Sequence, residues 1–177
     1  MTLIWQNLRQ NLEAQLLNRI ILILAFMMVF VTSVLAQDFS KAFDAYSVGD
    51  YTTAIKEWTL LAEQGDAHAQ SNLGNMYRDG EGVDQNYKKA VDWYRSAAEQ
   101  GHAYAQARLG FMYWQGNGVL KDGVIAHMWF NIANANGDEF SGGSREDVAE
   151  TMSQQAIESA NALARECLSS GYEKCGY

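Results

Sequence analysis

Proline is absent from the 177-residue sequence, and cysteine, histidine and basic residues are few. Without proline, long helices are free of their strongest breaker, and proline-rich linkers are excluded. Two cysteines are too few for a zinc ribbon or a disulfide-rich miniature scaffold. The 13 Lys and Arg residues stand against 21 Asp and Glu residues, which gives a formal charge of −8. We therefore expect no nucleic-acid partner, because binding to phosphate depends mainly on Lys and Arg.

Residue patterns that signal catalysis or metal binding are also missing. The sequence has no G-x-S-x-G, no P-loop, no dinucleotide-binding glycine pattern and no S-x-x-K. His68, His102 and His127 show no H-x-x-x-H spacing, so we expect them to be surface or boundary residues. The acidic segment 79–84 resembles a calcium loop only faintly, since Val83 stands where an oxygen ligand belongs, and we interpret it as a turn. The sequence therefore predicts neither a metal ion nor a cofactor.

The first 36 residues have the organisation of a targeting segment. Residues 20–31 are twelve consecutive apolar residues, preceded by two arginines and followed by small residues that end at Ala36. This order is typical of a secretory signal peptide over residues 1–36, and cleavage would leave Gln37 as the new N-terminus. The alternative is an uncleaved N-terminal anchor, because the segment before the apolar run is long. We expect a periplasmic or secreted protein, or one anchored in the inner membrane and facing the periplasm.

The sequence after the leader contains an internal repeat. Residues 66–101 align with residues 102–137 at an offset of 36, and 14 of the 36 positions are identical. Ungapped agreement at this level indicates duplicated structural units.

Each unit has the apolar spacing of two helices. Ala69, Leu73, Met76 and Tyr77 form one helical stripe, and Ala90, Trp93, Tyr94 and Ala97 form a second. Glycines separate the two stripes and close the unit, as expected for antiparallel helices joined by tight turns. The sequence predicts an all-α protein, a short right-handed α-solenoid in which each helix pair is buried by stacking on the next.

The residues of this repeat also indicate a family. The pattern A-x-A-Q-x-x-L-G-x-M-Y-x-x-G-x-G-V, followed by A, W-[YF] and a closing Gly, occurs at 67–101 and again at 103–137. It resembles the Sel-one-like repeat (SLR) family, relatives of the tetratricopeptide repeats. Residues 39–65 look like a tetratricopeptide half-unit that leads into the array. The resemblance implies a non-enzymatic adaptor or scaffold that binds a protein or peptide in a concave groove.

After the repeats, residues 138–177 are predicted to close the end of the solenoid. We expect a loop over 138–143 and one capping helix over 144–169, with Ser144 as its N-cap. Cys167 and Cys175 are eight residues apart, so a disulfide between them requires the chain to turn back. In an oxidising compartment we favour that bond, which would staple the tail to the capping helix; two free thiols are the alternative.

The candidate binding residues are those that differ between the two copies on one face of the first helix of each unit. They are Asn75 and Arg78 in the first copy, and Arg108, Phe111 and Trp114 in the second. A face that varies between copies is not needed for stacking, and the inner helices of such arrays line the binding surface. Phe111 and Trp114 are either aromatic anchors of this groove or core residues under the capping helix.

Two other functions stay open at this point. One is an enzyme acting on cell-wall or β-lactam substrates, as linked to some cysteine-rich SLR proteins, although the serine motif for it is missing. The other is a membrane-anchored scaffold for envelope assembly, which requires that the leader is not cleaved.

Overall fold

The computed structural model describes residues 17, 19–22 and 39–175. The chain forms two compact units, Met1–Ser40 and Lys41–Tyr177, and the second contains both repeats. The expected cleavage site between Ala36 and Gln37 lies outside the described residues, as does most of the predicted leader. In the part of the chain that the structure describes, no helix is long and apolar enough to span a bilayer.

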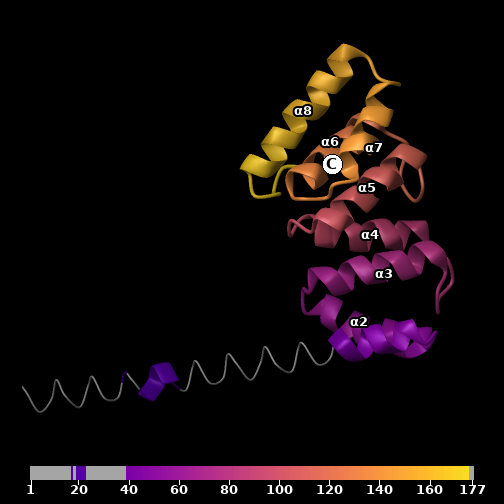
Figure 1. Cartoon of the computed structure of the whole chain (residues 1–177), viewed down its shortest axis with the longest axis vertical. Helices are drawn as coiled ribbons and strands as arrows, with labels where there is room; N and C mark the ends of the chain where they lie inside the picture. Colours follow the sequence, from indigo (N-terminus) through magenta and orange to yellow (C-terminus); the bar gives the residue numbers. More distant parts are fainter. Residues whose placement is uncertain (1–16, 18, 23–38, 176–177) are drawn as a thin grey trace, which may run out of the picture. The chain divides into compact units, whose positions relative to one another are not determined.

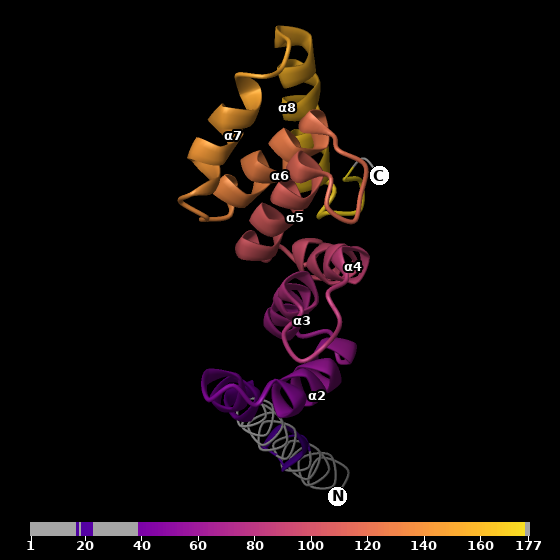
Figure 2. The same ribbon diagram turned by 90° about the vertical axis from the view of Figure 1, so that its right-hand side faces the viewer.

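Helices make up the regular structure of the second unit. Residues 41–47 are helical, and they are followed by α2 (Tyr51–Glu63), α3 (Ala67–Asp79), α4 (Tyr87–Ala98), α5 (Ala103–Gln115), α6 (Gly123–Ala135), α7 (Ser141–Ala149) and α8 (Gln154–Ser169). From α2 to α6 each helix packs on the next one along the chain, while α7 and α8 both pack on α6 (Figures 1 and 2). The predicted all-α stack of antiparallel helix pairs is confirmed.

Polar side chains fix where the helices begin. The residues Asp50, Asp66, Asn86, His102, Asp122 and Ser153 each accept a hydrogen bond from a backbone N–H in the first turn of the following helix. Such N-caps satisfy donors that have no partner inside the helix. α3 and α5 end at Gly80 and Gly116, whose φ angles of 74° and 77° suit glycine because it has no Cβ.

The two repeats also share a buried hydrogen bond that ties each unit to the preceding helix. Gln70 donates from Nε2 to the carbonyl of Ala62 over 3.1 Å, and Gln106 donates to the carbonyl of Ala98 over 2.9 Å. Both glutamines are buried, so each bond satisfies groups that water does not reach. The 36-residue offset therefore applies to polar contacts as well as to apolar packing.

One cluster of buried side chains extends from α4 to the C-terminal tail, and Ala67 and Tyr77 of α3 pack against it. The largest fully buried side chains of the described residues include Leu73, Met76, Tyr94, Leu109, Trp129 and Phe130. One detail differs from the apolar stripe read from the sequence, because Trp93 is only half-buried whereas its neighbour Tyr94 is completely buried.

The capping region is two helices, not the single helix predicted over residues 144–169. Ser144 lies inside α7 rather than at a helix start, and the residue that caps the long final helix is Ser153, whose Oγ accepts from the Ala156 N–H over 3.2 Å. The expected loop over 138–143 is correspondingly shorter, because α7 already begins at Ser141.

Local hydrogen bonding explains the break between α7 and α8. Thr151 directs both its N–H and its hydroxyl to the carbonyl of Val148, at 3.0 and 2.7 Å. A hydroxyl that binds a nearby carbonyl in this way offers the backbone an alternative to a continuing helix. Met152 then packs against the core at the corner, so α8 starts in a new direction and reaches α6.

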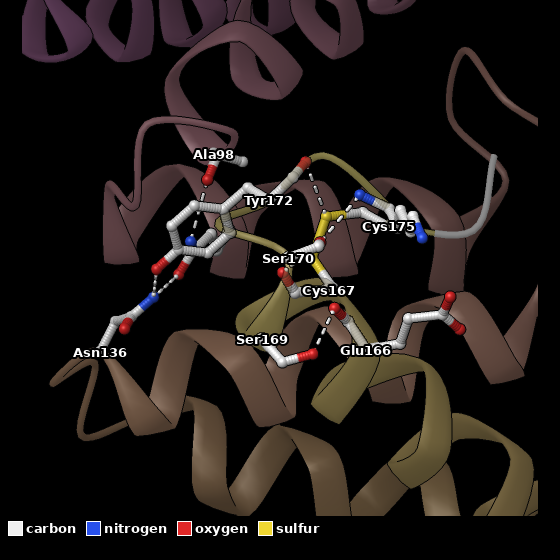
Figure 3. The surroundings of a disulfide bond; sticks show 10 residues. Ala98, Asn136, Glu166, Cys167, Ser169, Ser170, Tyr172 and Cys175 are labelled. Atoms are coloured by element: carbon white, nitrogen blue, oxygen red, sulfur yellow. Dashed lines mark hydrogen bonds between the residues drawn. A yellow bond between two sulfur atoms is a disulfide. The ribbon is translucent and has the colours of Figure 1, made fainter.

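The C-terminal tail folds back on α8 and is held there covalently. Cys167 and Cys175 form a disulfide with their Cα atoms 4.4 Å apart, and both residues are buried (Figure 3). The reversal passes through Gly171, which has a φ of 65°. Between the two cysteines, the Tyr172 hydroxyl accepts a 2.8 Å hydrogen bond from Nδ2 of Asn136 at the end of α6 (Figure 3). The tail is thereby fastened to the second repeat as well as to α8.

Replacing Cys167 and Cys175 by alanine should lower the free energy of unfolding by about 2–3 kcal/mol, because an uncrosslinked unfolded chain gains loop entropy. Urea unfolding followed by circular dichroism measures this, and reductant should shift the midpoint of the wild type but not that of the double variant. Equal midpoints for the oxidised wild type and the variant would contradict a stabilising role for the bond.

Candidate binding groove

The five candidate residues from the sequence all lie half-buried on the first helices of the two repeats. Asn75 and Arg78 are on α3, and Arg108, Phe111 and Trp114 are on α5. None is fully enclosed, so each combines contacts inside the protein with an exposed edge. The structure divides them into a polar cluster and an aromatic cluster.

The polar cluster is centred on the amide of Asn75. Its Oδ1 accepts hydrogen bonds from the hydroxyls of Tyr94 on α4, at 2.7 Å, and Tyr104 on α5, at 3.3 Å. The guanidinium carbon of Arg108 lies 4.5 Å from the centre of the Tyr104 ring, a distance at which a cation is attracted to the ring face. Burial raises the pKa of Tyr94, so its hydroxyl stays protonated and remains a donor to Asn75. Side chains from three successive helices are thus connected.

The two arginines of this face differ in their charge balance. Arg78 is paired with Asp79 through two parallel bonds, Nε to Oδ1 at 2.8 Å and Nη2 to Oδ2 at 2.6 Å. This pairing lowers the pKa of Asp79 and, with its charge matched, Arg78 has little left to offer a ligand. The charge of Arg108 also lowers the pKa of Asp79, but only at longer range. No ion pair joins these two residues in the described chain.

The aromatic cluster is formed by Phe111, Trp114 and the buried Phe130 of α6. The rings of Phe111 and Phe130 meet edge to face with centroids 4.8 Å apart, and Trp114 lies 6.0 and 6.4 Å from those two rings. Both α5 aromatics therefore pack on α6. They stay half-buried, so packing on the core leaves part of each ring accessible.

A cavity of about 420 Å³ opens beside these clusters, between α5 and the segment that joins α6 to α7. The residues that line it are Tyr104, Ala107, Arg108, Phe111, Asp138, Phe140 and Ser141. Of the five candidates, Arg108 and Phe111 line this cavity, while Asn75, Arg78 and Trp114 do not. A volume of this size is within the range of small-ligand and side-chain pockets.

Sequence reasoning missed the remaining lining residues for two different reasons. Tyr104 precedes Arg108 by one helical turn and differs from its repeat counterpart His68, so extending the comparison by one turn would have found it. Asp138 and Phe140 lie after residue 137, outside the two aligned segments 66–101 and 102–137, so comparing those copies gives no signal for them.

The repeats use equivalent positions for two kinds of contact. In the first repeat, residues 75 and 94 are Asn and Tyr, joined by a hydrogen bond; in the second, residues 111 and 130 are both Phe, joined edge to face. Each pair bridges the two helices of its hairpin, and both of its members change together. In the second copy, an aromatic residue on α5 is therefore paired with an aromatic residue on α6.

His68 and His102 lie together at the end of the same face. The backbone N–H of Ala105 donates to Nδ1 of His102, so neutral His102 carries its proton on Nε2, which lies 3.1 Å from Nδ1 of His68. A metal ion on that Nε2 would require the other tautomer and would remove the helix cap. Elsewhere in the described residues, no three His, Cys, Asp or Glu side chains gather as a metal site.

Comparison with known proteins agrees with this architecture. The family model of the Sel1 repeat matches residues 67–102 and 103–138. The chain also resembles the crystal structure of a Sel1 repeat protein from Oxalobacter formigenes, with 35% sequence identity and a TM-score of 0.58, over 64% of this chain and 88% of that one. The chain belongs to the Sel1 repeat family.

A second Sel1-type structure is similar over a larger part of the chain. It is a protective antigen with an SLR fold, present in uropathogenic Escherichia coli strains, and it matches with 27% identity and a TM-score of 0.74 over 78% of this chain. The match covers 31% of the antigen, so this Sel1 protein spans about a third of that relative. Sel1 repeat proteins generally act as scaffolds for protein–protein interaction. No curated protein sequence matches the chain significantly.

The Asn75–Tyr94 contact of the first Sel1 repeat is open to a double-mutant cycle. Tyr94→Phe should cost about 1 kcal/mol of stability by removing one hydrogen bond. The double variant with Asn75→Phe recreates the Phe–Phe pair of the second repeat. Its loss of stability should be about 1 kcal/mol smaller than the sum of the losses in the two single variants. Chemical denaturation of the four proteins measures the coupling, and strictly additive effects would show that the two positions are independent.

Acidification should destabilise this Sel1 protein through His102. Burial, followed by the nearby His68, lowers the pKa of His102 in the folded state, while Asp66 acts weakly in the opposite direction. As the pH falls, the unfolded chain therefore binds a proton at His102 before the folded chain does. The contribution of His102 to the free energy of unfolding should be complete above pH ~6.5 and should be lost as the pH falls toward the lowered pKa of the folded state. The thermal midpoint measured from pH 7.5 to 5 tests this.

Two variants taken from the first repeat isolate the source of that pH dependence. His102→Asp puts the capping residue of Asp66 at the equivalent position and should flatten the profile while keeping the cap. His127→Val copies Val91 and removes the other histidine with a lowered pKa, which results from burial and the nearby Arg145. An unchanged slope in both variants would place the titrating groups elsewhere.

Proposed function

We propose that this Sel1 protein is an exported, non-enzymatic binding module that holds a peptide segment of a protein partner in the groove between α5 and the α6–α7 connection. The observation that carries the proposal is the cavity beside α5, whose lining includes three aromatic side chains, one arginine and one aspartate. Apolar walls with a few placed polar groups are typical of sites that recognise side chains.

Within this groove, Phe111 acts as an apolar anchor and Arg108 as the main polar contact. Phe111 is held by Phe130 on its inner edge, so it presents a fixed surface and loses little conformational freedom on binding. Asn75, Arg78 and Trp114 serve mainly to position neighbours, because each is already engaged inside the protein. This divides the original candidates into contact residues and supporting residues.

Export accounts for two otherwise separate features of the chain. The leader pattern of residues 1–36 directs a protein out of the cytoplasm, and the Cys167–Cys175 disulfide is of a kind that persists in oxidising compartments. The proposal places the mature chain in the periplasm or outside the cell, beginning at Gln37. A chain that keeps its leader in the membrane fraction would support the anchored scaffold instead.

Site-specific photo-cross-linking tests the groove in cells of the source organism. Phe140 lines the cavity and is 87% exposed, whereas Leu120 is 90% exposed and lies outside the lining, so the two positions are matched sites for p-benzoylphenylalanine. Position 140 should yield a discrete cross-linked product containing one recurring partner segment, and position 120 should not.

Two results would contradict the proposal. One is that neither position cross-links, and the other is that both give the same products, which would indicate contact without a defined groove. Circular dichroism of each variant confirms that its helices are intact.

Export is tested separately. The sequence obtained by N-terminal sequencing of the extracytoplasmic preparation should begin at Gln37.

A further inference from the structure

The cavity beside α5 contains a guanidinium, that of Arg108, which forms no ion pair with any of the described residues. Arg78 is neutralised by Asp79, but among residues 39–175 no acceptor lies within hydrogen-bond distance of the Arg108 guanidinium, and its Nε is buried without a partner. A buried donor that has no acceptor is costly, and such groups in native proteins usually have a reason. A ligand that supplies an anion to the outer nitrogens of Arg108 would provide a charged acceptor that the described residues do not place there.

The surroundings of Arg108 restrict the form of that anion. The Tyr104 ring supports one face of the guanidinium, and Phe111 and Phe140 supply apolar surface in the same lining. A planar guanidinium held against a ring presents its N–H edge in a fixed direction, which suits the two oxygens of a carboxylate. The aromatic surfaces beside it fit a large apolar group attached close to that carboxylate.

Asp138 argues against a highly charged anion in the same cavity. Its Oδ1 accepts from the N–H and hydroxyl of Ser141, at 2.9 and 2.7 Å, so the carboxylate is fixed at the start of α7. Its negative charge in the lining would repel a phosphate dianion, whereas it can accept a hydrogen bond from an amide N–H. A single carboxylate joined to amides and an apolar side chain is the chemistry of a peptide.

The first repeat lacks this combination at the equivalent positions. Arg108, Tyr104 and Phe111 correspond to Asn72, His68 and Asn75, which are uncharged or only weakly basic and carry no large apolar side chain. The cationic and aromatic character is therefore confined to the second repeat, next to the segment that closes the cavity. Repeat stacking does not require these residue types, because the first repeat stacks without them.

We propose that this pocket recognises a peptide carboxylate adjacent to a large apolar side chain, with the carboxylate on Arg108 and the side chain among Tyr104, Phe111 and Phe140. The inference rests on the peptide-binding function proposed above and specifies its ligand. The carboxylate has two sources in proteins, the C-terminus of a chain and the side chain of Asp or Glu, and the experiment separates them.

Four blocked amino-acid probes, titrated into the intact protein by NMR, test the ligand chemistry. N-acetyl-phenylalanine offers a terminal carboxylate beside an aromatic ring, and N-acetyl-glutamyl-phenylalaninamide offers a side-chain carboxylate beside one. N-acetyl-phenylalaninamide lacks the carboxylate, and N-acetylglycine lacks the ring. At least one of the first two should bind about tenfold more tightly than both of the last two. The stronger of the two identifies the source of the carboxylate.

Matched variants locate the binding. Arg108→Asn, which copies the residue of the first repeat, should lower the affinity for the preferred probe about tenfold. Arg165→Gln removes an exposed arginine of α8 and should leave that affinity unchanged. Phe140→Ala should lower the affinity for the probe several-fold. Leu120→Ala, at a similarly exposed site outside the lining, should not change it.

Equal binding of the amide and acid probes, equal affinity of the Arg108→Asn protein, or no binding of any probe would overturn the carboxylate inference. These outcomes are distinguishable from failure of the proposed function. A partner that still cross-links at position 140 in the Arg108→Asn protein would retain the groove and remove the carboxylate specificity. Absence of cross-linking together with tight binding of an acid probe would instead indicate a small-acid receptor.

Discussion

Each repeat of this protein depends on a close contact between a glycine on its first helix and an aromatic ring on its second. A Cβ atom at Gly74 would lie 2.5 Å from ring carbons of Tyr94, and one at Gly110 would lie 2.9 Å from the ring of Phe130. Real side chains do not approach so closely, so only glycine lets the helices of each hairpin approach to this distance. The packing of α3 on α4 and of α5 on α6 follows from that spacing.

The same contact determines the character of the groove. The residue after each glycine lies beside the ring that the glycine admits, so position 75 contacts Tyr94 and position 111 contacts Phe130. A tyrosine hydroxyl at this point requires a polar partner, because a buried donor must be satisfied, whereas a phenylalanine ring favours an aromatic one. The change from Tyr94 to Phe130 thus accompanies a change from polar Asn75 on α3 to aromatic Phe111 on α5.

The end of the array adds what the repeats by themselves do not contain. α7 and α8 both cover α6, and the disulfide and Tyr172 fasten the tail to the same region (Figure 3). Because α7 starts at Ser141, the preceding segment brings Asp138 and Phe140 beside α5 and closes the cavity. The cap that protects the apolar end of the solenoid therefore also supplies one wall of the proposed binding site.

The sequence by itself determined the repeat, its helix pairs and the helix face that carries Asn75, Arg78, Arg108, Phe111 and Trp114. This was possible because helix periodicity, caps and nearest-neighbour stacking recur every 36 residues and can be checked between copies. The tertiary structure alone decided that Arg78 is paired while Arg108 is not, that the capping region is two helices, and that residues 138–141 meet α5. These features depend on rotamers, on a local hydrogen bond at Thr151 and on contacts made by a segment outside the two aligned copies, so the comparison of the copies does not reveal them.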